Sequence, residues 1–506
     1  MFALAALATP ASLSAKQTLE EATDSIKTIY KNAQGGDASA QNIVGMWYYN
    51  GRHVDQDYKL AAKWWSRAAK AEDAQAIGNL GLCYQTGHGV DRDSLRATGL
   101  YNRSIREGNT ELLKRMAASA DKGNVFSQVY MALCYQKGIG VKKDIYKASS
   151  YFEMAAKKGS VDACRELGLL LLNNKQNTDA FGYFKTAAQK GDIPSTFYYG
   201  RMLAEGKGTK QDATLGMIQM QKAAEAGFAA AQLYLGRAYY EGNGVRKDPS
   251  QGYQWMLKAA RQNNSNAQFQ IAEKLVAGDG CQLDYNLATA WFGKAVANNH
   301  GKAFKKLFET GGALAGSPYL TYLQARKAIA TDNFETALKK SKDLQKSKTE
   351  AIAQTGKTLE GIILCNKDYA KRDLKKGVKM LEKCVATGNA TAEYVLGAMY
   401  DAGKQVERDQ NKAVDLISAS AKAGNPLAIS YLGDMYFEGR GVQQDYEKAI
   451  QCYNDASVLM TETAAKHLAA CYENGYGGLE ADQKKASQIL KGKYGSNLEA
   501  LVDLLP

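Results

Sequence analysis

The feature that most constrains the fold of this chain is a short sequence unit that recurs along nearly its whole length. Each unit contains a small residue, most often glycine, which we take as its anchor, and most consecutive anchors lie 36 residues apart. The anchors are Gly45, Gly81, Ala132, Gly168, Gly200, Gly236, Ala272, Ala325, Gly361, Gly397, Gly433 and Ala469. One such unit cannot bury its apolar residues alone, so the units are expected to stack on one another.

Four further positions keep step with the anchor and indicate what each unit folds into. In the second unit, Tyr84, Gly87, Val90 and Asp93 follow Gly81 by three, six, nine and twelve residues. The small anchor allows two helices to approach closely, and the tyrosine one turn later is expected to fill the space beside it. The glycine ends the first helix in a left-handed conformation, and the aspartate caps the second helix by accepting its free N–H groups. Each unit is therefore predicted to be a helical hairpin.

The composition agrees with a helical chain. Only 6 prolines accompany 48 glycines, which suits many helices, because proline disrupts helix interiors and glycine favours helix ends. We predict an all-α solenoid of about twelve antiparallel helical hairpins, in which the recurring residues are scaffold.

The spacing of the second helix carries a family resemblance. Its small and aromatic residues mostly fall 16, 20 and 23 positions after the anchor. This pattern resembles the Sel-like repeat family, a branch of the tetratricopeptide repeats with a longer inter-helix loop, over roughly residues 36–490. The unit at Gly168 instead resembles an ordinary tetratricopeptide repeat, since Ala180, Phe184 and Ala187 fall 12, 16 and 19 positions after it. The resemblance implies a right-handed superhelix, a secreted or periplasmic bacterial protein, and adaptor or host-contact roles.

The array is interrupted at two places. The anchors Gly81 and Ala132 are 51 residues apart, and the excess predicts an unpaired helix around Glu111–Ala120. A second break follows Ala272, where a helix beginning near residue 302 is stopped by glycines and a proline within residues 311–318. We predict that this second break separates an N-terminal repeat solenoid from a C-terminal one.

The predicted division gives four segments. Residues 1–15 are apolar and uncharged, as in the end of a secretory signal, although a frayed helix is the alternative. Residues 16–310 form the N-terminal solenoid, 319–492 the C-terminal solenoid, and 493–506 a tail. The signal-like start predicts a secreted or periplasmic protein, and a cytoplasmic one is the alternative. No stretch reaches 18 apolar residues, so no membrane span is predicted.

No motif predicts catalysis, a cofactor or a metal. The histidines are His53, His88, His300 and His467, none of them in a metal-ligand spacing. The 8 cysteines contain no CxxC pair, which signals neither a zinc site nor a disulfide framework. The Ser119–Lys122 motif has the spacing of a penicillin-recognising serine, but the supporting motifs are missing. We therefore expect a chain that is not an enzyme and binds no cofactor or metal.

The favoured function is a protein-interaction scaffold that binds a protein or peptide in the concave groove. In tetratricopeptide-type repeats, the first helix presents partner-facing side chains six and three residues before the anchor and one and four after it. Arginine and aromatic residues at these positions are favoured because binding hot spots are enriched in them. The candidates are Tyr49, Arg165, Arg201, Arg237, Tyr240, Tyr322, Arg326, Tyr394 and Phe437. Arg201 and Arg237 are predicted to lie about 10 Å apart, a basic ladder that suits an acidic or carboxylate-bearing peptide.

Two alternative functions remain open at this point. Residues 301–385 contain 18 lysines and arginines against 9 acidic residues, a balance that suits binding of nucleic acid or an acidic surface. A solvated helix face is the simpler reading of such a charge run, and it disfavours nucleic acid. A serine or cysteine hydrolase is the second alternative.

Overall fold

The computed structural model describes residues 24–308, 316–403, 406–456 and 462–490. Within these ranges the regular elements are helices and no strand occurs, which confirms the predicted all-α class. The chain divides into two compact units, Met1–Gln211 and Asp212–Pro506, which we call unit 1 and unit 2 and describe separately. The predicted signal-like segment 1–15 and tail 493–506 lie outside the described residues.

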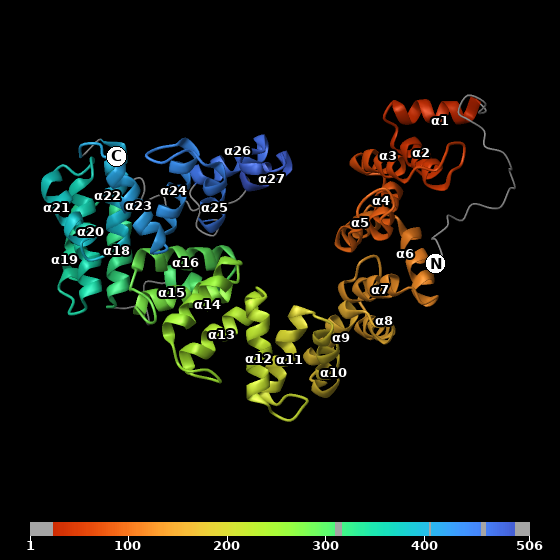
Figure 1. Cartoon of the computed structure of the whole chain (residues 1–506), viewed down its shortest axis with the longest axis horizontal. Coiled ribbons are helices and arrows are strands. Elements are labelled where there is room, and N and C mark those ends of the chain that lie inside the picture. The colour runs from red at the N-terminus through yellow and green to blue at the C-terminus, as the bar shows by residue number, and fades with distance from the viewer. Residues whose placement is uncertain (1–23, 309–315, 404–405, 457–461, 491–506) are drawn as a thin grey trace. The chain divides into compact units, whose positions relative to one another are not determined.

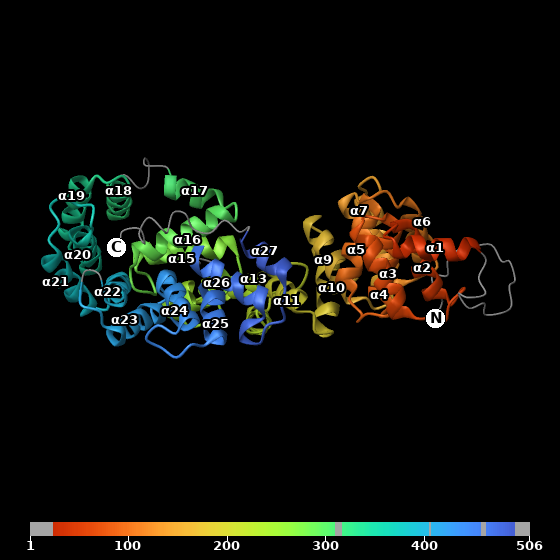
Figure 2. The same ribbon diagram turned by 90° about the horizontal axis from the view of Figure 1, so that it is seen from above.

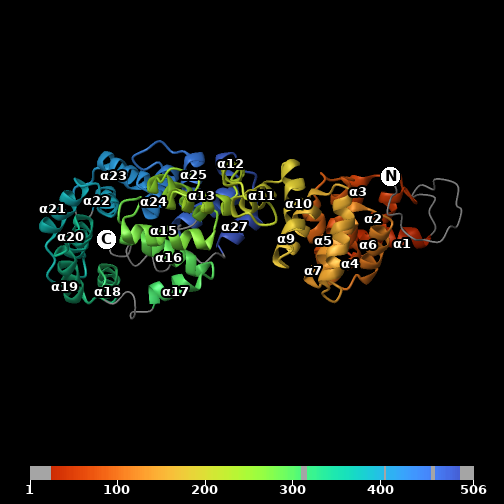
Figure 3. The same cartoon turned by 90° about the horizontal axis from the view of Figure 1, so that it is seen from below.

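The helices of unit 1 follow one another in chain order (Figure 1). They are α1 (Asp24–Gln34), α2 (Ala38–Asn50), α3 (Tyr58–Lys70), α4 (Ala74–Thr86), α5 (Ser94–Arg106), α6 (Thr110–Asp121), α7 (Val125–Lys137), α8 (Ile145–Lys157), α9 (Val161–Asn173), α10 (Asn177–Gln189) and α11 (Ile193–Glu205). Figure 3 shows α9 and α10 lying against each other, as the two helices of a predicted hairpin should.

Unit 2 contains the remaining helices. They are α12 (Ala213–Glu225), α13 (Ala229–Glu241), α14 (Pro249–Arg261), α15 (Ser265–Ala277), α16 (Tyr285–Ala297), α17 (Gly301–Phe308), α18 (Pro318–Ala330), α19 (Phe334–Gln345), α20 (Glu350–Cys365), α21 (Leu374–Val385), α22 (Ala390–Ala402), α23 (Gln410–Lys422), α24 (Pro426–Glu438), α25 (Tyr446–Ala456), α26 (Glu462–Asn474) and α27 (Gln483–Leu490). Figure 2 shows α15, α16 and α17 side by side.

Most helices alternate as the first and second members of repeats, and every predicted anchor lies on a first helix. The predicted unpaired helix is present as α6, and α17 begins at Gly301, next to the predicted start. The repeat anchored at Gly200 spans both units, because α11 belongs to unit 1 and α12 to unit 2. The repeated hairpins confirm the solenoid architecture.

Helix ends form as the recurring glycine and aspartate predict. Gly87 ends α4 with φ 82°, a left-handed conformation that a side chain would strain. Asp93 precedes α5, and its Oδ1 accepts a hydrogen bond of 2.8 Å from the main-chain N–H of Arg96. Each hairpin therefore has local signals that stop its first helix and start its second.

The anchor position brings the two helices of a hairpin together, but not in the way the sequence suggested. A Cβ atom on Gly81 would lie 2.8 Å from a ring carbon of Tyr101, which is on the second helix. A Cβ on Gly433 would likewise lie 2.6 Å from the ring of Tyr453. The side chain twenty positions later therefore fills the space beside the anchor. The expectation that the tyrosine three positions later fills it was wrong for these repeats.

Consecutive repeats are joined by buried polar contacts as well as apolar ones. A glutamine four residues before the anchor donates to the end of the preceding helix in several repeats. Gln128 Nε2, for example, lies 3.0 Å from the main-chain oxygen of Ala120, and Gln268 Nε2 lies 3.1 Å from that of Ala260. Both glutamines are buried, so the bond satisfies groups that water cannot reach.

A hydrophobic core in unit 2 includes residues from Leu233 to Met435. Tyr285 on α16 contacts Tyr319 on α18, with ring centroids 5.3 Å apart. The predicted division of the array at residues 311–318 lies mostly outside the described residues and stays a prediction. Helix α16, before this division, and helix α18, after it, pack directly against each other through these tyrosine rings.

Candidate functional site

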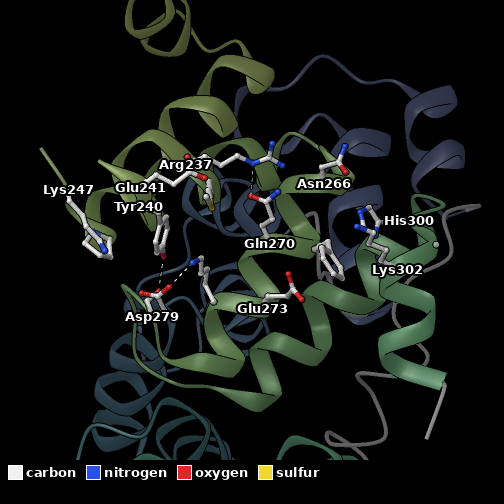
Figure 4. A pocket seen from close by; sticks show the side chains of 15 residues that line it. Arg237, Tyr240, Glu241, Lys247, Asn266, Gln270, Glu273, Asp279, His300 and Lys302 are labelled. Atoms are coloured by element: carbon white, nitrogen blue, oxygen red, sulfur yellow. Dashed lines mark hydrogen bonds and ion pairs between the residues drawn. The ribbon is translucent and has the colours of Figure 1, made fainter. Parts of the chain in front are cut away.

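A cavity of about 860 Å³ lies on unit 2, along three consecutive first helices (Figure 4). Helix α13 contributes Arg237 and Tyr240, α15 contributes Asn266 and Phe269, and α17 contributes Lys302. The first helices α13, α15 and α17 thus form its walls.

The lining residues occupy the positions that the resemblance assigns to the partner-facing surface. Arg237 and Tyr240 stand one and four residues after the anchor Gly236, and Asn266 and Phe269 stand six and three before Ala272. The structure therefore brings two of the predicted site residues, Arg237 and Tyr240, together in one cavity. Their role in binding stays a prediction.

One side of the cavity is held by a polar cluster around Tyr240. Its hydroxyl donates a hydrogen bond of 2.8 Å to the main-chain oxygen of Asp279. Lys274 Nζ lies 2.6 Å from the Asp279 carboxylate and 3.7 Å from the centre of the Tyr240 ring. Burial raises the pKa of Tyr240 above its ordinary value, so the phenol stays protonated and remains a donor.

The opposite side is formed by an aromatic stack. The ring of His300 lies on Phe269 with centroids 4.5 Å apart and planes 20° apart. His300 Nδ1 accepts a hydrogen bond of 3.2 Å from the main-chain N–H of Ala303. Burial, and after it the charge of Lys302, lowers the pKa of His300. The ring is therefore neutral near pH 7 and carries its proton on Nε2.

Arg237 spans the space between α13 and α15. Its side chain is exposed, and its Nε donates a hydrogen bond of 3.0 Å to Gln270 Oε1 (Figure 4). That bond holds the guanidinium over α15 and uses one of its five N–H groups.

The predicted site residues of unit 1 make contacts within their own array. The Tyr49 hydroxyl lies 3.0 Å from His88 Nδ1, and burial raises the pKa of Tyr49 to about 12. Arg165 lies 2.7 Å from the carboxylates of both Asp162 and Asp192. These contacts join α9 to the start of α11 and occupy the guanidinium of Arg165.

Arg201 also lies in unit 1, whereas Arg237 lies in unit 2. The Arg201 guanidinium lies 5.3 Å from the centre of the Tyr198 ring, and its Nε lies 3.9 Å from Glu205. The two units are described separately, so the predicted separation of Arg201 from Arg237 stays a prediction.

Burial removes two predicted residues of unit 2 from the candidate surface. Tyr322 and Tyr394 are only 2% and 3% exposed. Arg326 lies over the Tyr322 ring, 5.9 Å from its centre, while Phe437 is half-buried and stacks on His467 at 4.4 Å. The two tyrosines pack between repeats, which corrects their assignment to the partner-facing surface, because a buried ring has almost no area to offer a partner.

One contact between consecutive repeats recurs along the chain and was not predicted from the sequence. The residue four after an anchor contacts the residue seven after the next anchor, 39 positions later. We call each such pair a repeat clasp. The clasps are Tyr49–His88, Tyr240–Asp279, Asp401–Arg440 and Phe437–Tyr476. The residue types differ from one clasp to the next, but the separation of the two residues stays the same. A search of the sequence for residue pairs at that separation could have found the clasps.

The basic segment has partners within the chain for several of its lysines. Lys371 Nζ lies 2.7 Å from Glu335, and Lys346 Nζ lies 2.8 Å from Asp343. Both lysine side chains are about three-quarters exposed. Exposed ion pairs of this kind contribute little to stability. They are typical of a solvated helix face.

The cysteines show no sign of a reactive site. Cys83, Cys134 and Cys471 are buried, as predicted, and burial raises their thiol pKa values to about 12, 11 and 11. Thiols with raised pKa values form little of the nucleophilic thiolate at neutral pH.

Among the described residues, no group of three or more His, Cys, Asp or Glu side chains could hold a metal ion. No helix in those ranges combines the length and apolarity of a membrane span.

Comparison with known proteins identifies the repeat. A family model described as Sel1 repeat matches ten stretches, residues 38–73, 74–109, 125–160, 161–192, 193–228, 229–264, 265–300, 390–425, 426–457 and 463–487. A solved protective antigen present in uropathogenic Escherichia coli strains, which displays an SLR fold, is 23% identical and has a TM-score of 0.35, with 94% of this chain and 96% of that chain covered. A Sel1 repeat protein from Oxalobacter formigenes is 30% identical and has a TM-score of 0.40, with 58% of this chain and 84% of that chain covered. No curated protein matches the chain.

Proposed function

The chain belongs to the Sel1 repeat family, and on that premise we propose that it is a protein-interaction scaffold that holds a segment of a partner protein in the cavity of unit 2. Proteins built from these repeats are generally interaction scaffolds. The single observation that carries the proposal is the cavity of about 860 Å³ along α13, α15 and α17. A site of that size accommodates several side chains of an extended peptide.

The composition of the cavity supports binding more than chemistry. The Tyr240 hydroxyl donates to the main-chain oxygen of Asp279, and the His300 ring is stacked on Phe269. The lining also includes Arg237 and Met256, and aromatic residues, methionine and arginine are the side chains in which protein interfaces are enriched.

The test is partner capture with a variant in which the cavity is filled. Asn266 is exposed and lines the cavity, so Asn266→Trp should occupy part of it without disturbing the core. Gln254 is exposed on the second helix α14, and Gln254→Trp is the matched control for an added tryptophan. The proposal expects the wild type and Gln254→Trp to retain the same partner and Asn266→Trp to lose it, with melting temperatures unchanged. Equal retention by both variants would reject the cavity as the binding site.

A further inference from the structure

The unit 2 cavity is lined by three carboxylates, each with a partner in the chain, and by four cations, of which Lys274 is ion-paired. Among the described residues, Asp279 is paired with Lys274 at 2.6 Å, and Glu273 lies 3.6 Å from Lys306. Glu241 accepts a hydrogen bond of 2.6 Å from Asn243 Nδ2. Each carboxylate of the cavity therefore has a donor in the chain.

The other three cations of the cavity have no carboxylate partner in the described residues. Arg237, Lys247 and Lys302 all line it, and within the described ranges none of them is joined to a carboxylate in an ion pair. Arg237 uses its Nε on Gln270, which leaves the two terminal nitrogens of the guanidinium to a ligand. Lys302 lies next to His300, whose proton on Nε2 adds another donor.

The amide groups reinforce this excess of donors. Gln270 accepts from Arg237 through its oxygen, so its NH₂ group remains available to donate. Donors on α13, α15 and α17 thus line one cavity, beside two carboxylates that are ion-paired with lysines and a third that accepts from an amide. Cationic donors along one cavity suit an anionic ligand, because charge-assisted hydrogen bonds are shorter and stronger than neutral ones.

The apolar surface of the cavity lies beside these donors. Phe269, stacked on His300, lines the cavity, and Met256 lines it as well. A ligand that places an anion near Arg237 would therefore have an aromatic surface for a neighbouring apolar side chain. Arginine and aromatic residues together are typical of binding hot spots.

We propose that the cavity recognises an acidic peptide segment, whose glutamate or aspartate carboxylates pair with Arg237, Lys302 and Lys247 along the cavity while an adjacent apolar side chain packs on Phe269. This inference rests on the proposed function and adds the chemistry of the partner. It assigns recognition to three cations within unit 2 and does not require the ladder from Arg201 to Arg237.

The first experiment selects peptides from a random decapeptide display library on the immobilised full chain, with Asn266→Trp as the counter-selection. The sequences retained by the wild type and not by Asn266→Trp are expected to be enriched in Asp and Glu together with an apolar residue. Enrichment in Lys and Arg, or in neutral residues alone, would overturn the inference and leave the proposed function standing. If no peptide depends on the open cavity, the proposed function itself fails.

The second experiment measures the affinity of one selected peptide by fluorescence anisotropy. Arg237→Ala combined with Lys302→Ala should weaken binding by about ten-fold or more, as expected for loss of charge-assisted contacts. Lys222→Ala combined with Arg261→Ala removes the same charge from exposed positions on α12 and α14 and should change affinity less than about two-fold. Equal weakening by both pairs would show attraction to the net positive charge and contradict recognition by the cavity. Substituting Gln for each acidic residue of the peptide should abolish the difference between the wild type and the cavity pair.

Discussion

The hydroxyl of Tyr240 donates a hydrogen bond of 2.8 Å to the main-chain oxygen of Asp279, which joins one repeat to the next across 39 residues of sequence. Tyr49 and His88 are also 39 residues apart, and the Tyr49 hydroxyl forms a hydrogen bond with the His88 side chain, not with the main chain. The two bonds pair a tyrosine hydroxyl with different groups, a main-chain oxygen in one and an imidazole nitrogen in the other. Contacts between repeats, and not only within them, hold such an array together.

Removal of the Tyr240 hydroxyl tests the clasp. Tyr240→Phe keeps the ring and deletes the donor, so it should destabilise the chain by about 0.5–1.5 kcal/mol. The measurement is the urea midpoint of the full chain. Tyr239→Phe, one position earlier on the same helix, is the control and should leave the midpoint nearly unchanged. A loss no larger than that of the control would mean that the bond adds nothing to stability.

The recurring aspartates are expected to act as helix caps. Asp144 accepts from the main-chain N–H of Lys147 at 3.0 Å, and Asp445 accepts from that of Lys448 at 2.9 Å. Asp144→Ala and Asp445→Ala should each cost about 1 kcal/mol, whereas substitution by Asn should cost much less, since Asn also caps well. Thermal melts of the four variants check this. Partner binding should survive at permissive temperature, and its loss in a stable alanine variant would point to a ligand role.

His467 should make stability depend on pH. The hydrogen bond from its Nδ1 to Asp434, 2.7 Å long, raises the pKa of His467 above its ordinary 6.5, and nearby Glu438 acts in the same direction while burial and Arg440 oppose it. Because the folded state binds the proton more tightly, the stabilisation is complete below the ordinary pKa and disappears as pH rises through the raised one. Urea midpoints of the wild type and His467→Gln should therefore differ more at about pH 5.5 than at about pH 8.5.

The control for that prediction removes the acceptor. Asp434→Asn keeps the shape of the side chain and its bond to Tyr453 but not the charge. In this background, the effect of His467→Gln should differ less between the two pH values, because only Glu438 then raises the pKa of His467. A difference that persists at its full size would assign the pH dependence to a group other than Asp434.

The basic segment is expected to be solvated surface. Reversal of Lys339, Lys340, Lys371 and Lys375 to Glu should change the affinity of the cavity peptide less than a few-fold at physiological salt, because exposed charges at a distance are screened. Anisotropy at about 0.15 M salt measures this. A loss of several orders of magnitude would favour the alternative in which residues 301–385 bind an acidic surface.

The fold could be predicted from the sequence because its signals are local. The turn at Gly87 and the cap at Asp93 each depend on a few neighbouring residues, and the same signals return in almost every repeat. The unpaired helix α6 was found for the same reason, since it changes the spacing between anchors.

The site could be predicted only in part. The positions of Arg237 and Tyr240 on the first helix followed from the repeat register, and both line the cavity. Burial of Tyr322 and Tyr394 could not be foreseen, because it depends on which side chains the adjacent repeats place against them. The clasps were missed because each joins residues of different types in different repeats.

The central claim is that a partner segment lies in the cavity of unit 2, and site-specific cross-linking tests it most directly. A benzoylphenylalanine at position 266, in place of Asn266 on the cavity wall, is compared with one in place of Gln254 on α14. Both side chains are exposed, so the two proteins differ in where the photoreactive group lies and little else. The account predicts a cross-linked partner from position 266 and none from position 254. A cross-link that forms equally from both positions, or only from 254, would contradict it.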